Sequence, residues 1–139
     1  MRTLLVTCVD AGIRGAVEEL EERLGIVGCD RLQVPGGPLA LVAEGSPRQA
    51  VLTWVELLAR FKDVGAVHLV SHQHCLAYQR NLGGFFHDER EVLERDLLTA
   101  RRTLEGAVYG LRVECHLLPW VGGEAGRYMA AEPVGNGAA

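Results

Sequence analysis

The sequence has no long hydrophobic run and little positive charge. Its longest apolar stretch, residues 34–43, is interrupted by two prolines and two glycines, and it is far shorter than the roughly 18 residues that a membrane-spanning helix needs. Asp10 interrupts the apolar N-terminus too early for a signal peptide. The 14 basic residues are outnumbered by 18 acidic ones, whereas nucleic-acid-binding domains are typically basic. We therefore expect a cytoplasmic protein that binds neither membranes nor nucleic acid.

Cysteine is scarce as well. The 139 residues include four cysteines, which are Cys8, Cys29, Cys75 and Cys115. Apolar residues make up 48% of the chain, which is enough to build a core without a disulfide framework. In the cytoplasm the cysteines should be reduced thiols that either bind a metal or pack as small hydrophobic side chains. The length fits one domain, which we expect to span residues 1–130, with a disordered tail at 131–139.

Short apolar runs alternate with amphipathic segments along the chain. The apolar runs are rich in β-branched residues and lack strict alternation, which is typical of strands buried on both faces. They cover residues 3–9, 30–34, 65–71 and 111–118. Helical spacing predicts helices over residues 13–24, 46–62 and 88–105, and the apolar stripe of the second includes Trp54 and Phe61. The β-α-β-α-β-α-β order predicts a three-layer α/β domain around a mostly parallel central sheet of about four strands.

Candidate functional residues lie where the predicted strands end, which is where parallel sheets usually bind ligands. Cys8 and Asp10 follow the first strand, the turn at residues 35–38 follows the second, and His72 and Cys75 follow the third. A lone cysteine at a strand end is usually a packed hydrophobic residue. Two thiols and an imidazole gathered at one sheet edge, however, are a ligand set typical of zinc. Together, Cys8 after the first strand and His72 and Cys75 after the third favour a zinc site.

Two segments resemble the motifs of the β-class carbonic anhydrases. They are TCVDAGIR at residues 7–14 and LVSHQHC at residues 69–75. In that family a C-x-D-x-R motif follows the first strand, and H-x-x-C follows a later strand. The resemblance implies a β-carbonic-anhydrase-like fold and a Zn²⁺ ion bound by Cys8, His72 and Cys75. It also implies a lyase activity, the reversible hydration of carbon dioxide to bicarbonate by zinc-bound hydroxide.

The resemblance assigns further residues but departs from the family at one of them. Asp10 matches the catalytic aspartate, whereas the position of the family's arginine is Gly12, and Arg14 lies two residues further on. If Arg14 holds Asp10 off the metal, one zinc position stays open for water and the protein is an enzyme. If it does not, Asp10 closes the zinc site of a catalytically inactive structural or regulatory protein. Gly36 and Gly37 match a loop beside the metal, where a backbone N–H would bind substrate.

Three further expectations remain. A metal-free flavodoxin-like module, which binds a small molecule or a partner in the same crevice, is a third interpretation of the chain. His74 and His87 are candidates for proton transfer, although an ordinary surface position is the commoner explanation for a histidine. The family resemblance, together with the adjacent Phe85 and Phe86, favours a homodimer or a higher homo-oligomer.

Cys115 and His116 are neighbours on the last predicted strand. Successive side chains of a strand point to opposite faces of the sheet, so the two are poorly placed to share a metal. We expect a core cysteine beside an exposed or capping histidine.

Overall fold

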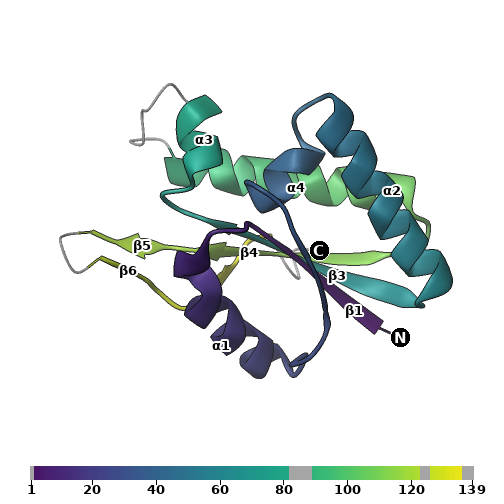
Figure 1. Ribbon diagram of the computed structural model, residues 1–139, viewed down its shortest axis with the longest axis horizontal. Helices are drawn as coiled ribbons and strands as arrows, with labels where there is room; N and C mark the ends of the chain where they lie inside the picture. The colour runs from purple at the N-terminus through teal and green to yellow at the C-terminus, as the bar shows by residue number, and fades with distance from the viewer. Residues whose placement is uncertain (1, 82–88, 123–125, 136–139) are drawn as a thin grey trace.

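The computed structural model describes residues 2–81, 89–122 and 126–135 and has three layers around a central sheet (Figure 1). The strand order of the sheet is β2-β1-β3-β4-β7. Its strands are β1 (Arg2–Thr7), β2 (Asp30–Gln33), β3 (Val64–His72), β4 (Arg112–Leu118) and β7 (Glu132–Pro133). The first four are parallel, and β7 pairs antiparallel with β4. The predicted mostly parallel α/β fold is confirmed, with β7 added at one edge.

Helices cover both faces of this sheet. The long helices are α1 (Arg14–Leu24), α2 (Ser46–Phe61) and α4 (Glu89–Ala107), and the short ones are η1 (Ala11–Ile13), η2 (Gly37–Leu41) and α3 (Leu76–Asn81). The view in Figure 1 shows α1 on one face and α2 and α4 on the other. Among the described residues, no helix combines the length and the apolar character needed to cross a membrane.

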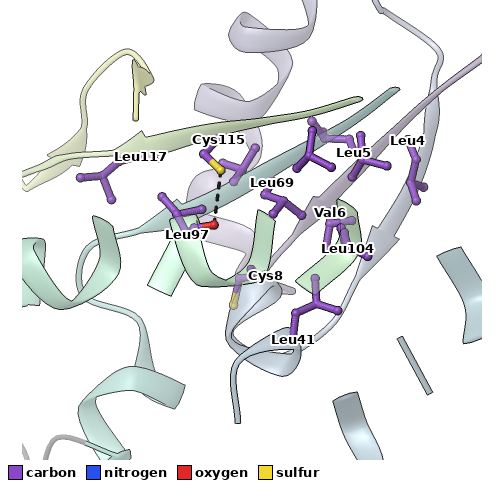
Figure 2. Close-up of a cluster of buried hydrophobic side chains, with 14 of the residues drawn as sticks. Leu4, Leu5, Val6, Cys8, Leu41, Leu69, Leu97, Leu104, Cys115 and Leu117 are labelled. Carbon is purple, nitrogen blue, oxygen red and sulfur yellow. Dashed lines mark hydrogen bonds between the residues drawn. The ribbon is translucent and has the colours of Figure 1, made fainter. Parts of the chain in front are cut away.

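The main core lies between the sheet and α4. Leu69 of β3 and Leu97 and Leu104 of α4 are fully buried there (Figure 2). Cys115 of β4 is buried in the same layer, where its thiol donates to the Leu97 carbonyl oxygen at 3.4 Å. Side chains alternate along a strand, so the odd-numbered residues of β3 and β4 face α4 and the even-numbered ones face α1. Cys115 is therefore the core cysteine that we expected.

Several short elements were missing from the sequence prediction. They include η2, α3 and a hairpin of β5 (Trp120–Val121) and β6 (Arg127–Tyr128). The first turn of the expected loop at 78–86 belongs to α3, and residues 82–88 lie outside the described part of the chain. Elements of two to six residues are too short to show a hydrophobic period, which is why the pattern did not reveal them.

The expected disordered tail at 131–139 is wrong in its first half. Glu132 and Pro133 form β7, and Ala131 and Val134 on either side are buried. The Val134 N–H donates to the Cys115 carbonyl oxygen at 3.0 Å. Proline is tolerated in this strand because β7 is an edge strand. Residues 136–139 lie outside the described part of the chain.

α2 buries a narrower stripe than its sequence suggested. Val51 and Val55 are 1% and 0% exposed, whereas Trp54 and Phe61 are 45% and 74% exposed. Each residue turns the helix by about 100°, so Trp54 lies at the margin of the stripe formed by the two valines. The expectation that both aromatic side chains belong to the core is wrong.

The turn after β2 presses against the end of β1 at Gly37. The φ angle of Gly37 is +55°, and a Cβ atom added there would lie 2.9 Å from both the Cys8 nitrogen and the Thr7 carbonyl carbon. Both neighbours are backbone atoms that cannot move aside easily. Glycine at this position therefore lets the turn approach the strand end that carries Cys8.

We predict that Gly37→Ala lowers the free energy of unfolding by about 1–3 kcal/mol, because it combines a left-handed backbone with a steric clash. Gly15→Ala in α1 is the matched control, since no neighbouring atom lies within 4 Å of its added Cβ. The control should be neutral or stabilising by up to about 1 kcal/mol. Urea denaturation of both variants measures the difference, and equal midpoints would contradict the prediction.

Candidate metal centre

Neighbouring parallel strands bring three potential ligands to one edge of the sheet. Val6 of β1 pairs in parallel with Leu69 of β3, so both strands end at the same edge of the sheet. Cys8 follows β1, and His72 is the last residue of β3. Cys75 is the residue before α3. We call these three side chains, Cys8, His72 and Cys75, the candidate metal centre.

The geometry of the candidate metal centre suits a tetrahedral ion. The two Sγ atoms are 4.0 Å apart, close to the distance of about 3.8 Å that follows from Zn–S bonds of about 2.3 Å at a tetrahedral angle. One ligand atom from each residue lies within 4.8 Å of the other two. All three residues are buried, with exposures between 1% and 6%. The sequence prediction that these residues converge is correct.

Hydrogen bonds at Nδ1 fix the orientation of the His72 imidazole. Its Nδ1 lies 2.9 Å from both the Gln73 carbonyl oxygen and the Tyr128 hydroxyl. The hydroxyl itself donates to the same carbonyl at 2.8 Å, so Nδ1 must carry the proton and donate. Nε2 is buried and has no hydrogen-bond partner among the described residues. A buried lone pair of this kind, with the opposite nitrogen fixed by a carbonyl, is typical of a metal-binding histidine.

The two sulfurs share a hydrogen bond that separates their proton affinities. The bond from Cys75 is the largest cause that lowers the pKa of Cys8. Together with further bonds, including one from the Gly36 N–H at 3.3 Å, and against the opposing effect of burial, it brings that pKa to about 4. The same bond and burial raise the pKa of Cys75. The shared bond therefore favours the thiolate form of Cys8 and the protonated form of Cys75, and a divalent cation is well suited to replace the shared proton.

A buried carboxylate holds the loop between His72 and Cys75. His74 adopts a left-handed backbone with φ +58°, and its N–H donates to both oxygens of Glu89 at 2.9 and 3.0 Å. Burial raises the pKa of Glu89, and the His74 N–H opposes that shift. On the other side, Gln73 accepts the Trp120 N–H through its side chain at 2.8 Å. The loop that presents Cys75 is therefore fixed by α4 and by the β5–β6 hairpin.

Asp10 and Arg14 do not form the ion pair that one of the two alternatives requires. Asp10 Oδ1 accepts the Gly12 N–H at 2.8 Å and caps η1. Both residues are exposed, and within the described residues no ion pair joins them. No Asp10 oxygen belongs to the group of mutually close ligand atoms at the candidate metal centre. The Gly12 amide, at the position of the family's arginine, thus holds this carboxylate.

A cavity of about 260 Å³ opens beside the candidate metal centre. Its lining includes Cys8, Asp10, Gly36 and the apolar side chains of Val9 and Leu76. A small molecule in this cavity would lie against both Cys8 and Asp10.

The two glycines expected to bind substrate use their N–H groups within the protein. The Gly36 N–H donates to Cys8 Sγ at 3.3 Å, and the Gly37 N–H donates to the Val34 carbonyl oxygen at 2.8 Å. Gly36 still lines the cavity. Their observed roles are therefore to support the Cys8 thiolate and to permit the close approach of the turn.

Sequence reasoning missed the residues that surround the ligands. Tyr128 and Glu89 lie in no recognisable motif, and Gln73 is one of the unspecified positions of H-x-x-C. Their contacts join segments that are up to 56 residues apart. The His74 ring packs against Trp120 with centroids 5.0 Å apart. His87, Phe85 and Phe86, which we considered for proton transfer and association, lie outside the described residues.

Known proteins resemble this chain in structure but not in sequence. No family model matches it, and no curated protein does. A carbonic anhydrase from Streptococcus mutans has a TM-score of 0.58 at 15% identity, covering 96% of this chain and 81% of its own. The β-carbonic anhydrase CafD of Aspergillus fumigatus has a TM-score of 0.53 at 14% identity, and the match covers 93% of this chain and 89% of CafD. The apo form of a carbon disulfide hydrolase has a TM-score of 0.55 at 15% identity, and the match covers 85% of this chain and 73% of the hydrolase. The fold is therefore β-carbonic-anhydrase-like.

We predict that Tyr128→Phe weakens zinc binding by about 10–100-fold, because groups that orient a metal ligand typically have effects of this size. The change removes one hydroxyl and leaves the ring that packs against His72 with centroids 5.4 Å apart. Competition with a chromogenic chelator measures the affinity. Tyr109→Phe, at an exposed position, is the control, and equal affinities for both variants would contradict the role of Tyr128.

Proposed function

We propose that this protein is a zinc-dependent lyase that reversibly hydrates carbon dioxide to bicarbonate. One observation carries the proposal: two cysteines and a histidine converge at the carboxyl edge of the sheet, and the histidine Nε2 has no hydrogen-bond partner in the described part of the chain. The likeness of the fold to carbonic anhydrases supports the same conclusion. The likeness to a carbon disulfide hydrolase supports small linear substrates of this type more broadly.

The residues present fit a zinc ion in number and in donor type. Bound by Cys8, His72 and Cys75, zinc would lower the pKa of a water molecule enough to supply hydroxide near neutral pH. Tyr128 and the Gln73 carbonyl keep the proton on His72 Nδ1, which leaves Nε2 available as a ligand. A thiolate ligand opposes the ionisation of water by adding negative charge to the site, so hydrogen bonds to the sulfurs, such as that from Gly36, are expected to help.

Asp10 would act on the substrate side of the centre. Asp10 lines the same cavity as Cys8, and its Oδ1 is held by the Gly12 N–H. In this position it would accept a hydrogen bond from the attacking water and orient the lone pair toward carbon dioxide. The apolar walls formed by Val9 and Leu76 would hold an uncharged linear molecule without competing for its oxygens.

Stopped-flow measurement of carbon dioxide hydration tests the proposal directly. Zinc-loaded wild-type protein should accelerate hydration, and Cys8→Ser should fall to the uncatalysed rate. Cys29→Ser is the matched control, because Cys29 bonds to Glu21 and lies outside the candidate metal centre. Equal rates for wild type and Cys8→Ser would refute the hydratase. Retained zinc with no hydration would instead favour the inactive zinc-binding alternative, and protein without zinc would favour the metal-free one.

Substitution of Asp10 should lower the rate of hydration more than substitution of Arg14. We predict that Asp10→Asn lowers hydration by about 100-fold or more while zinc stays bound, because it removes a positioned acceptor. Arg14, the second proposed catalytic residue, would supply only a supporting positive charge. It is exposed and its charge is screened by water, so Arg14→Ala should cost less than about tenfold. A larger loss in Arg14→Ala than in Asp10→Asn would overturn this assignment.

We also propose that the protein associates as a homodimer or a higher homo-oligomer. β2 is an edge strand, and edge strands tend to be covered. An apolar groove of about 500 Å³ lies beside it, where Trp54 and Leu57 are both 45% exposed. A second copy of the chain would bury these side chains.

Light scattering during gel filtration should therefore give at least twice the 15.1 kDa of one chain. The double variant Trp54→Ser/Leu57→Ser should shift to the monomer, whereas Tyr109→Ser at another exposed position should not. A monomeric wild type would refute the association.

A further inference from the structure

A second cluster of potential metal ligands lies further back along β3 and β4. His68 of β3 pairs with Glu114 of β4, and His116 is two residues further along β4. All three are even-numbered, so their side chains share the face of the sheet opposite the α4 core. His116, which we expected to be exposed or to cap an element, is instead 4% exposed.

The ligand atoms of these three residues converge on one point. His68 Nδ1 lies 2.9 Å from His116 Nε2 and 3.6 Å from Glu114 Oε2, and one ligand atom of each lies within 4.8 Å of the other two. We propose that His68, Glu114 and His116 form a second metal site, which takes a late first-row divalent cation such as Zn²⁺. It is separate from the candidate metal centre and shares no ligand with it.

The donor set and its spacing fit this class of ion. Two imidazoles and one carboxylate are a ligand combination that proteins use for zinc and its neighbours. At metal–nitrogen distances of about 2.05 Å, a separation of 2.9 Å between His68 Nδ1 and His116 Nε2 corresponds to an angle of about 90°. If the separation between these two nitrogens widens to about 3.4 Å, the angle at the metal becomes tetrahedral. The Glu114 oxygen at 3.6 Å is too far for a hydrogen bond to His68, so it can still move toward a cation.

Burial favours the neutral form of both imidazoles. Burial lowers the pKa of His68. Burial, the neighbouring His68 imidazole and the charge of Arg23 lower the pKa of His116 to about 4. Neutral imidazole is the form that binds metals, so few protons need to be displaced at neutral pH. Glu114 supplies the negative charge that offsets the nearby Arg23 and Arg112, both of which disfavour a cation.

A cavity gives access to the cluster from the α1 side. It has a volume of about 400 Å³, and its lining includes Leu20 and Leu24 of α1 together with Glu114 and His116. The Glu114 side chain is 39% exposed, whereas the imidazoles are buried. A cation would therefore reach the carboxylate first and the two nitrogens behind it. His68 precedes His72 by four residues, about 13 Å along an extended strand, so the two sites can be loaded independently.

Titration of the chelator-treated full chain with Co²⁺ distinguishes the two sites. Cobalt bound by cysteine gives a thiolate charge-transfer absorption, and cobalt bound by histidine and carboxylate does not. We expect two equivalents to bind, only one of them with thiolate absorption. Glu114→Gln should weaken the thiolate-free equivalent by about tenfold or more and leave the thiolate absorption unchanged. Cys8→Ser/Cys75→Ser should show the reverse.

Glu22→Gln is the matched control, since Glu22 is an exposed acid on α1 outside both clusters. Glu114 is half-exposed, so its variant should fold, and unfolding midpoints of the metal-free proteins verify that. His116→Gln, followed by zinc analysis after dialysis, is a second measurement and should reduce two zinc ions per chain to one. Binding of a single, thiolate-bound equivalent by wild type, or no difference between Glu114→Gln and Glu22→Gln, would overturn the second site. Neither result depends on hydration of carbon dioxide.

Discussion

The parallel pairing of β1 with β3 is the constraint on which the candidate metal centre depends. Because Val6 lies opposite Leu69, the chain leaves both strands at the same edge of the sheet, and Cys8 meets His72 there. A glycine at position 37 then allows the turn after β2 to close against this edge. The ligands are thus placed by backbone pairing between segments far apart in the chain, and their positions follow from the fold before any metal binds.

The neighbours of the ligands complete this arrangement. Each ligand is approached by a different part of the chain: Gly36 donates to Cys8, Tyr128 contacts His72, and Glu89 holds the loop before Cys75. These contacts fix the histidine tautomer and the sulfur positions, which are the two features that a tetrahedral ion requires in advance. A site built in this way loses little conformational entropy when a cation binds.

The sequence predicted what depends on local pattern and on motif. The four parallel strands follow from short apolar runs rich in β-branched residues, and the three long helices follow from helical periodicity. Cys8, His72 and Cys75 follow from the rule that sites lie at carboxyl ends of strands. The partners of these ligands were beyond reach because Tyr128 and Glu89 act through contacts distant in sequence and lie in no motif. Short elements such as β7 depend on tertiary pairing rather than on period. The hydrogen bond of Asp10 to Gly12 was equally invisible, because it depends on the backbone conformation of η1.

The two histidines of β3 also restrict how this strand can be aligned. His68 and His72 are separated by four residues and so share one face, while Leu69 on the other face is packed under α4. A slip of β3 by a single residue would exchange the two faces. Both imidazoles would then enter the leucine layer without hydrogen-bond partners, at a cost of about 1–3 kcal/mol each. The polar side chains that form the two clusters therefore also protect the strand against misalignment during folding.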